Sequence, residues 1–324
     1  MGQTNTTANM SPDDVAYYDK TLLANAFALQ IHTLFGDVRP LPTGQDTMTI
    51  KFERDEILPL ATTPIVESVT PVSEKMTPTW ISCELKQYGS YQKVSDVLSW
   101  TSRDNKLNRV SMAQGEQAGR SLDVICRDVI VAGTNVIYPS THDERTDITS
   151  SDKLSTALLD EAIVNLRSRN AKPITAMVNP DEGYATTPLN EAYIGVNSTD
   201  IDMSALTEAA GWKPVEKYAR NTAIIKGEVG AYKQIRFTQT SLGKVWVDGG
   251  NGSTVDVYAT LILGRNAYGI SQLAGHAMEM IINPVGSGGT ENPLALYGTS
   301  AWKATFGAVI LNDDFMVRIE HALL

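Results

Sequence analysis

Two stretches of alternating polar and apolar residues, with a proline-containing segment between them, constrain the fold more than any other feature of this chain. Residues 46–54 (DTMTIKFER) and 81–94 (ISCELKQYGSYQKV) alternate in the manner of β-strands and are expected to pair as a hairpin. The segment between them contains Pro59, Pro64, Pro71 and Pro78. Because proline lacks an amide N–H and has a fixed φ, a continuous ladder cannot form there. The sequence therefore predicts a long, irregular, projecting tip, and loops of this length are usually functional or bound to another surface.

A long amphipathic helix is the second constraint. Asp104 or Asn105 can cap its start, and Gly133 ends it directly after Ala132. Its apolar stripe consists of Leu107, Val110, Ala118, Leu122, Ile125 and Val129. At about 1.5 Å per residue the helix spans about 40 Å, more than most globular helices, and it predicts a flat, elongated subunit with this helix as its spine.

The other segments predict an arm at the N-terminus, a separate α/β unit and a C-terminal pair of strands. Residues 1–15 form a polar tail, and residues 15–35 a short amphipathic helix that Gly36 closes. Downstream of a loop at 140–152, the patterns predict a helix at 153–170, a short strand at 174–178, several strands within 231–263 and two strands around the turn at 312–314.

The composition is that of a globular protein. With 324 residues, 42% of them hydrophobic, the chain can bury the core of one large or two ordinary domains. A net charge of −10 argues against a large surface that neutralises phosphates, so tight nucleic-acid binding is not expected. No apolar run is long enough for a membrane span, and the first residues lack the pattern of a signal peptide. Cys83 and Cys126 predict reduced structural thiols in a protein made and used without export.

The common enzyme signatures are absent from the sequence, which has no GxxxxGK[ST], no GxGxxG after a strand, no HExxH and no GxSxG. The histidines are far apart, and none has a second ligand at metal-binding spacing: His32, His142, His276 and His321. Adjacent acids such as Asp313 and Asp314 could bind a cation, but turns and solvated helix faces explain them more simply. The run 286–292 (GSGGTEN) is interpreted as a flexible connection. No catalytic residue, cofactor or metal is predicted.

Several stretches together resemble the major capsid proteins of tailed bacteriophages, in particular the branch found in N-four-like podoviruses and related prophages. They are residues 85–98 (LKQYGSYQKVSDVL), 115–138 (GEQAGRSLDVICRDVIVAGTNVIY), 302–320 (WKATFGAVILNDDFMVRIE) and 264–275 (GRNAYGISQLAG). They occur in the family's order over nearly the whole chain. The loose arm, projecting hairpin, spine helix and α/β unit read from the residues are also the parts of that family's fold.

The resemblance implies an α+β fold of the Hong Kong 97 type. Its parts would be an N-terminal arm (1–45), an extended E-loop (46–100), a peripheral domain with the spine helix (101–150, rejoined by 256–324) and an axial domain (151–255). It also implies that axial domains meet at five-fold and six-fold axes, while the E-loop and arm lie across neighbouring subunits. The expected function is then structural: self-assembly into the icosahedral shell that encloses a double-stranded DNA genome.

Apolar residues on the E-loop are the candidate assembly interface, because burial on another copy stabilises them more than exposure does. They are Ile65, Val66, Val69 and Trp80. The alternative is a local mini-core within the monomer. Near the hairpin base, Tyr88 and Tyr91, with Trp100, are expected to pack on the spine helix, and Gly89 to permit a close backbone approach. Lys75 offers a cross-linking amine, but no partner is recognisable and no cross-link is predicted.

The expected partners are other copies of the chain, as hexamers and pentamers, together with portal, scaffolding and decoration proteins. Only weak, non-specific contact with packaged DNA and no membrane contact are expected, in a virion assembled in the host bacterial cytoplasm. A cellular encapsulin-like compartment around a cargo enzyme is the main alternative. A soluble hydrolase is a further one, although it would require clustered polar groups that the sequence does not show.

Overall fold

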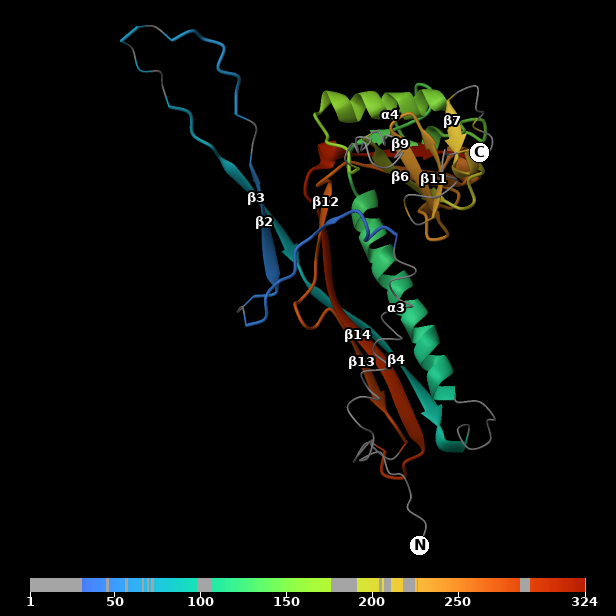
Figure 1. Ribbon diagram of the computed structural model, residues 1–324. Helices are drawn as coiled ribbons and strands as arrows, with labels where there is room; N and C mark the ends of the chain where they lie inside the picture. Colours follow the sequence, from blue (N-terminus) through green and yellow to red (C-terminus); the bar gives the residue numbers. More distant parts are fainter. Residues whose placement is uncertain are drawn as a thin grey trace, which may run out of the picture.

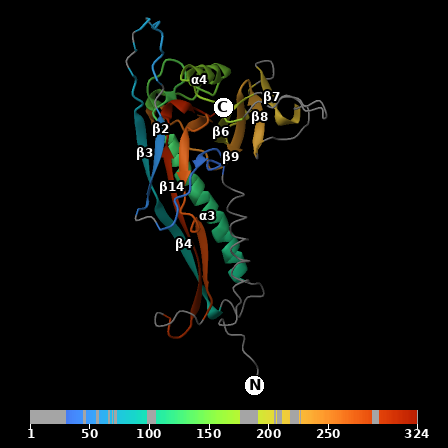
Figure 2. The same cartoon turned by 60° about the vertical axis from the view of Figure 1, so that its left-hand side comes forward.

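The computed structural model describes residues 31–44, 47–55, 58–65, 67–68, 70, 73–97, 106–175, 191–203, 206, 211–217, 225, 227–285 and 292–323. These residues form an elongated body from which one hairpin projects (Figures 1 and 2). One end of the body is a sheet of long strands with a long helix beside it. The other end is a larger sheet with a short helix packed on it.

The long-strand sheet is built around β14 (Tyr297–Ile310). Its neighbours are β4 (Lys86–Ser95) on one edge, and β13 (Met278–Asn283) and β12 (Tyr268–Ser271) on the other, all antiparallel, with β1 (Asp37–Val38) parallel to β12. Even-numbered residues of β14, such as Trp302 and Phe306, point into the core, whereas Ala301 and Lys303 face the other way. One strand therefore supports both the core and an outer sheet face.

The long helix predicted from the sequence is confirmed as the spine helix α3 (Lys106–Val131), which covers the core side of β14. Its buried stripe packs against β14 and β12, and its members are Ala118, Leu122, Cys126 and Ile130. Buried polar groups fix the alignment of helix and strand: Gln114 Nε2 donates to the Ser300 carbonyl at 2.7 Å, and Ser300 Oγ donates to Gln114 Oε1 at 2.5 Å. Because these groups are buried, sliding the helix along the strand would leave them unsatisfied.

The larger sheet has eight strands, in the order β5-β15-β11-β6-β9-β8-β7, with β10 beside β11. The strands are β5 (Val136–Ile137), β15 (Met316–His321), β11 (Val257–Leu263), β6 (Tyr193–Ser198), β9 (Ile235–Thr240), β8 (Glu228–Tyr232), β7 (Trp212–Pro214) and β10 (Val245–Trp246). α4 (Thr156–Ser168) packs on it through Leu159, Ile163 and Leu166. Ser155 caps α4 by accepting the Leu158 N–H, so the predicted helix at 153–170 is confirmed. Short 3-10 turns complete the connections: η2 (Arg145–Asp147), η5 (Val215–Lys217), η6 (Asn251–Ser253) and η8 (Asp313–Phe315).

The projecting hairpin consists of β2 (Thr49–Asp55) and β3 (Pro78–Glu84), paired antiparallel from Thr49↔Glu84 to Asp55↔Pro78. The prediction of one strand over 81–94 is wrong at Leu85, which is buried and divides it into β3 and β4. β3 pairs with β2, whereas β4 pairs with β14. Leu85 is the residue at which the chain leaves one sheet and enters the other. Its N–H donates to the Met48 carbonyl, so this backbone group keeps a hydrogen bond at the change of sheet.

The structure gives a different outcome for each of three further predicted segments. Of the helix predicted at 15–35, residues 15–30 lie outside the described residues, and residues 31–36 form a turn instead, with the Leu34 N–H donating to the Ile31 carbonyl. The two C-terminal strands are confirmed as β14 and β15, but η8 carries the chain from one sheet to the other. Of the strand predicted at 174–178, Thr175 forms a single bridge to Ala192, and residues 176–178 are not among those described.

The eight-stranded sheet takes β5, β11 and β15 from ranges expected to be peripheral, and the rest from the range expected to be axial. The assignment of ranges to peripheral and axial domains stays a prediction. Within the described part of the chain, none of the helices is both long and apolar enough to span a bilayer.

Candidate assembly surfaces

The base of the hairpin is seated directly on the long-strand sheet. Phe52 of β2 and Cys83 of β3 are buried in a small cluster with Leu311. A Cβ on Gly269 would lie 2.9 Å from the Phe52 ring, and a Cβ on Gly307 would lie 2.9 Å from Cys83 Sγ. Because no larger residue fits at either glycine without a shift, the two glycines let the inner face of the hairpin pack against the backbone of β12 and β14. The base is therefore part of the folded core.

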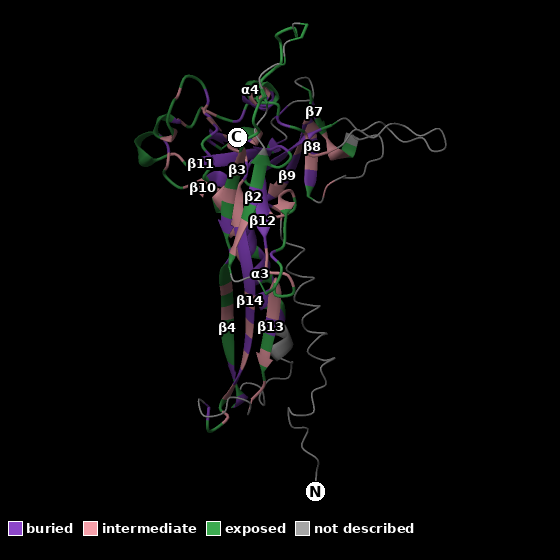
Figure 3. Ribbon diagram, turned by 90° about the vertical axis from the view of Figure 1, so that its left-hand side faces the viewer, coloured by how far each residue is buried: buried purple, intermediate pink, exposed green. Residues whose placement is uncertain are grey.

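Beyond this base the residues of the hairpin are mostly exposed (Figure 3), and several of them are large and apolar. Leu60 is 87% exposed, Ile65 77% and Trp80 57%. Ile65 and Trp80 belong to the interface predicted from the sequence, which stays a prediction. Leu58, Leu60 and Met76, which the sequence analysis did not single out, are exposed as well. Their position beside Pro59 and within the same loop was the available signal. Val66 and Val69, the other predicted residues, lie outside the described residues.

Trp80 lies on the outer face of the hairpin, directly across from Glu53. Its neighbours on the inner face, Ile81 and Phe52, are directed to the body, because side chains alternate along a strand. A local mini-core would have buried Trp80 and Ile65 together. The exposure of both side chains does not support that alternative.

On β4, the predicted residues Tyr88, Gly89 and Tyr91 occupy three different environments. Tyr88 is half-buried against the core beneath α3, as predicted. Gly89 pairs with Lys303, and a Cβ there would lie 2.7 Å from the Trp302 carbonyl oxygen, so the close backbone approach is confirmed. Tyr91 is 62% exposed, so the prediction that it packs on the spine helix is wrong. Three positions from Tyr88 in a strand, it must face the opposite side of the sheet. Trp100 lies outside the described residues.

Tyr91 instead belongs to a row of side chains on the outer face of the long-strand sheet. Ala301 of β14 is directly opposite Tyr91, and Ile281 of β13 is directly opposite Ala301. Polar residues flank this row, with Lys93 and Thr299 paired on one side. The outer face thus has an apolar centre with a polar surround, which is the usual anatomy of a contact surface.

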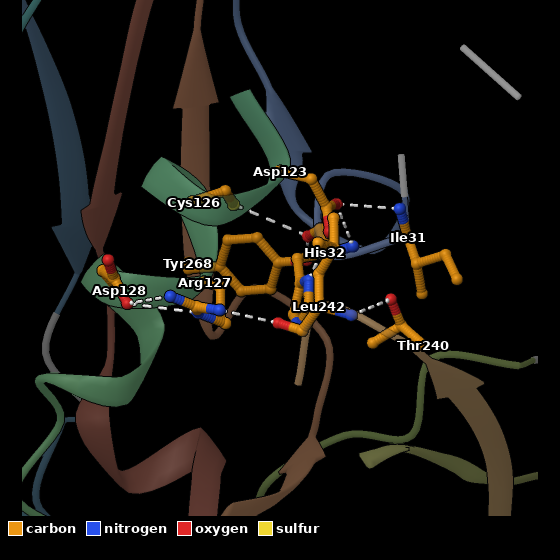
Figure 4. Close-up of polar contacts among 9 residues, drawn as sticks. All are labelled: Ile31, His32, Asp123, Cys126, Arg127, Asp128, Thr240, Leu242 and Tyr268. Carbon is orange, nitrogen blue, oxygen red and sulfur yellow. Dashed lines mark hydrogen bonds and ion pairs between the residues drawn. The ribbon is translucent and has the colours of Figure 1, made fainter. Parts of the chain in front are cut away.

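One turn of α3 holds the root of the N-terminal segment (Figure 4). The Asp123 carboxylate is fully buried and accepts the backbone N–H groups of Ile31 at 2.8 Å and His32 at 2.7 Å. The ring Nδ1 of His32 lies 2.7 Å from the other carboxylate oxygen. A single side chain on the spine thus fixes the backbone and the ring of His32, and through them the point at which the N-terminal segment joins the body.

The His32 carbonyl is held by two donors from different elements. The Tyr268 hydroxyl of β12 donates to it, as does Cys126 Sγ of α3 at 3.6 Å. Burial raises the pKa of Tyr268 well above its usual value, and burial, followed by the charge of Asp123, raises the pKa of Cys126. Both groups therefore keep their protons and act as donors.

The next turn of α3 contacts the larger sheet. Arg127 donates to the Leu242 carbonyl at 2.8 Å and pairs with Asp128, also at 2.8 Å (Figure 4). Leu242 follows β9, and its own N–H donates to Thr240 Oγ1. The spine helix therefore holds the N-terminal root and the β9–β10 connection on successive turns.

A second buried carboxylate joins the spine to the larger sheet. Glu320 of β15 is fully buried and accepts two hydrogen bonds from Arg145, at 2.6 and 2.8 Å, and one from Arg318 at 2.7 Å. The Arg145 guanidinium also lies 3.7 Å from the centre of the Trp246 ring. Arg318 donates to the carbonyl groups of Val131 and Gly133 at the end of α3, where a cation complements the helix dipole.

Chemical sites of other kinds are not found among the described residues. No group of three or more His, Cys, Asp or Glu side chains there is placed to hold a metal ion. His321 is fully buried between Thr260 Oγ1 and the Ala322 carbonyl, and burial lowers its pKa to about 4, so it is a neutral structural group near neutral pH.

A cleft of about 420 Å³ at the hairpin base is lined by polar and apolar residues. Four of its charged side chains form pairs, Arg39 with Asp37 at 3.0 Å and Arg169 with Asp314, and Arg54 donates to the Leu311 carbonyl. None of the described residues that line it is Ser, Cys or His.

Comparison with known proteins gives no match to a protein-family model and none to a curated protein. Solved structures do match along the whole chain. The capsid of Ralstonia phage GP4 has a TM-score of 0.66 at 14% identity, over 100% of this chain and 96% of that chain. This chain has the fold of a phage capsid protein. The head structure of Helicobacter pylori bacteriophage KHP40 (TM-score 0.59, 11% identity, 100% and 95% covered) and the capsid of cyanophage P-SCSP1u (0.58, 12%, 91% and 89%) share that capsid fold.

The match confirms the α+β fold of the Hong Kong 97 type predicted from the sequence. In this capsid fold the long helix is α3 and the projecting hairpin is β2–β3.

Proposed function

We propose that this protein is a major capsid protein that self-assembles into the icosahedral shell enclosing a phage double-stranded DNA genome. The observation that carries the proposal is the match of the entire chain to the capsid of Ralstonia phage GP4, with 96% of that chain covered. The role is structural, and other copies of the chain are its principal partners. An encapsulin-like compartment is not favoured, because the structures named above are phage capsids and heads.

The physical basis for self-association is the exposed apolar surface of the hairpin. Leu60, Ile65 and Trp80 are each more than half exposed in the isolated chain. Burial of apolar surface contributes about 25 cal/mol per Å², so one hairpin on another copy gives a weak contact, and repetition over many subunits gives a stable shell. We assign residues 46–100 as the E-loop that makes this contact, with Val66 and Val69 among its interface residues.

The outer sheet face centred on Tyr91 is the surface we assign to the same type of contact. It has an apolar row in the middle and lysines at its border, whereas the hairpin loop carries Glu67 and Glu74. Opposite charges at the rim favour the correct alignment of two copies. Gly89, two residues before Tyr91, permits the close approach of β4 and β14 on this face, because a Cβ there would lie 2.7 Å from the Trp302 carbonyl oxygen.

The finer assignments belong to the same proposal. We place the chain in the N-four-like podovirus and prophage branch, on the stretches 85–98, 115–138 and 302–320. We assign 1–45 to an arm, 101–150 with 256–324 to a peripheral domain and 151–255 to an axial domain. Hexamers and pentamers assemble in the host bacterial cytoplasm with portal, scaffolding and decoration proteins. The acidic charge of −10 supports only weak contact with packaged DNA.

Negative-stain electron microscopy with size-exclusion chromatography tests the proposal. The purified chain is examined at several concentrations and salt strengths, beside a variant that lacks residues 56–79. Shells, tubes or capsomer rings are expected for the complete chain, and their loss is expected for the variant. A compact monomer of the complete chain under every condition, including co-expression with a scaffolding protein, would overturn the proposal.

A further inference from the structure

The turn between β10 and β11 contains the only asparagine of the sequence that is followed by glycine. Asn251 and Gly252 belong to the 3-10 turn η6, and both are exposed to solvent. Gly252 has a φ of 67°, in the left-handed region that glycine adopts without strain. Asparagine is one of the chemically less stable residues, and a following glycine has no Cβ to keep its amide nitrogen away from the asparagine side chain. The turn is therefore a candidate for covalent modification.

Both reacting groups of this pair are available. In the part of the chain that the structure describes, the Gly252 N–H and the Asn251 carboxamide have no hydrogen-bond partner. The turn itself is held by Thr254 Oγ1, which donates to the Asn251 main-chain carbonyl at 3.1 Å, and by the Ser253 N–H, which donates to the Gly250 carbonyl at 3.1 Å. Short 3-10 turns have poor hydrogen-bond geometry, and exposed turns open locally while the domain stays folded. Rotation of Asn251 towards the Gly252 nitrogen therefore requires only a local opening.

We infer that Asn251 is a site of spontaneous deamidation through a succinimide. The Gly252 amide nitrogen attacks the Asn251 side-chain carbon Cγ and gives up its proton, and the bond from Cγ to Nδ2 breaks with release of ammonia. Water then opens the ring. Attack of water at Cγ gives aspartate, whereas attack at the main-chain carbonyl carbon gives isoaspartate, in which the backbone continues through the side chain. Water is the only co-reactant, so the reaction requires no enzyme and no cofactor.

Two other asparagines in turns provide an internal comparison. Asn170 and Asn266 are exposed and have φ values of 58° and 59°. Each precedes a buried alanine, Ala171 at 6% and Ala267 at 1% exposure. The alanine Cβ and the burial of the residue both hinder the approach of the amide nitrogen to the carboxamide. Exposure of an asparagine in a turn is therefore not sufficient, and these two side chains are expected to stay intact.

The turn lies beside the junction at the buried Glu320 carboxylate. η6 contacts η2, and Arg145 of η2 donates two hydrogen bonds to Glu320. The packing is tight, since a Cβ on Gly250 would lie 2.6 Å from the Ile148 carbonyl oxygen. Isoaspartate lengthens the backbone by one carbon atom, whereas aspartate keeps the backbone length and adds only a negative charge. We expect isoaspartate in this turn to disturb the junction and aspartate to leave it intact.

Mass spectrometry of the folded chain tests the inference. The purified chain is kept in a mildly alkaline buffer, well below its melting temperature, and is digested with trypsin at intervals. Fragment 245–265 contains no other asparagine and no glutamine, so loss of an amide from this fragment is assigned to Asn251. We expect Asn251 to convert, with isoaspartate among the products, while Asn170 and Asn266 stay intact. Conversion should be slower than in the urea-unfolded chain by about tenfold to a hundredfold, because the two hydrogen bonds of the turn must first open.

Two variants separate the products. Asn251→Gln keeps the carboxamide but lengthens the side chain, so ring closure is much slower and no conversion is expected. Asn251→Asp supplies the aspartate product from the start, and its melting temperature, measured on fresh protein, should equal that of the fresh unsubstituted chain. Aged unsubstituted chain, which contains isoaspartate, should melt at a lower temperature than either.

The outcomes decide the inference without reference to assembly, so they do not depend on the proposed function. If Asn251 stays intact in the folded chain under conditions in which the unfolded chain converts, the turn protects the pair and the inference is wrong. Equal conversion of Asn266 would also contradict it, because the following glycine would then not be decisive. An unchanged melting temperature of isoaspartate-containing protein would remove the expected effect on the junction.

Discussion

The middle of α3 and the projecting hairpin differ in how their side chains are satisfied. Around Asp123, buried donors and acceptors from three elements are paired within the chain, and His32 is 1% exposed. On the hairpin, by contrast, the Leu60 side chain is 87% exposed and is not packed in the core of the isolated chain. Substitutions in the first region therefore act on folding, and substitutions in the second act on association. The free energy of unfolding of the monomer distinguishes the two, and the following changes are ordered by their expected effect on it.

Asp123→Ala is expected to give the largest loss. It leaves the N–H groups of Ile31 and His32 and the His32 ring without their acceptor, and buried unsatisfied groups cost about 1–3 kcal/mol each. We expect the free energy of unfolding to fall by about 3–5 kcal/mol in urea denaturation. Asp314→Ala is the control, because Asp314 and its partner Arg169 are 59% and 39% exposed and pairs at such exposure contribute less than about 1 kcal/mol. Equal losses for both variants would remove the distinction between the two regions.

Phe52→Ala tests whether the hairpin base belongs to the folded core. Loss of a buried phenylalanine costs about 3–5 kcal/mol when its site cannot collapse, and we expect about 3 kcal/mol here, because Phe52 borders exposed hairpin on one side. Hydrogen exchange should increase in β2 and β3 while α4 stays protected. If amide exchange increases equally throughout the chain, the packing of Phe52 on Gly269 does not stabilise the hairpin separately from the rest of the fold.

Acidification is expected to destabilise the larger sheet through His321. Its folded pKa is lowered to about 4 from an ordinary value of 6.5, so between these pH values the unfolded chain binds a proton that the folded chain does not. Stability from this group is complete above about pH 6.5 and decreases as the pH falls towards 4, by about 3 kcal/mol in all. Urea titrations at pH 7 and pH 4.5 measure it. His321→Gln should be less stable at pH 7 and should lose less on acidification.

Leu60→Ser is expected to have the smallest effect on the monomer. A solvent-exposed substitution in an irregular loop changes the free energy of unfolding by less than about 0.5 kcal/mol. Assembly, followed by light scattering against concentration, should nevertheless be weaker than for the unsubstituted chain. Unchanged assembly would mean that the hairpin tip contributes nothing to association.

Elements with local periodicity could be predicted from the sequence. The stripe of α3 repeats every three to four residues, and its ends carry their own signals, so its bounds were nearly correct. The hairpin followed from strand alternation and from prolines. By contrast, the division at Leu85 depends on β14, which lies more than two hundred residues further along the chain, and nothing local marks it.

The polar junctions could not be predicted for the same reason. In the sequence, nothing distinguishes Asp123 from the other charged residues of the helix. Its burial depends on His32, which lies 91 positions earlier in the chain and contacts it only in the folded structure. Glu320 likewise belongs to an ordinary strand pattern, and its partner Arg145 lies in the short 3-10 turn η2, 175 positions earlier in the chain. On the candidate surface, residues in the proline-containing segment had a sequence signal, whereas the exposure of Tyr91 follows from the pairing of β4 with β14.

The alignment of α3 with β14 has a mechanical consequence. The helix and the strand run beside each other, and Gln114 and Ser300 join them near one end of α3. At the other end of α3, Arg318 of β15 donates to the terminal carbonyl groups and so joins the helix to the eight-stranded sheet. Because α3 is attached to the long strand at one end and to the larger sheet at the other, bending of the body must strain one of these attachments. A load applied at the far end of β14 is thus transmitted along the body to the eight-stranded sheet instead of being absorbed by a local bend.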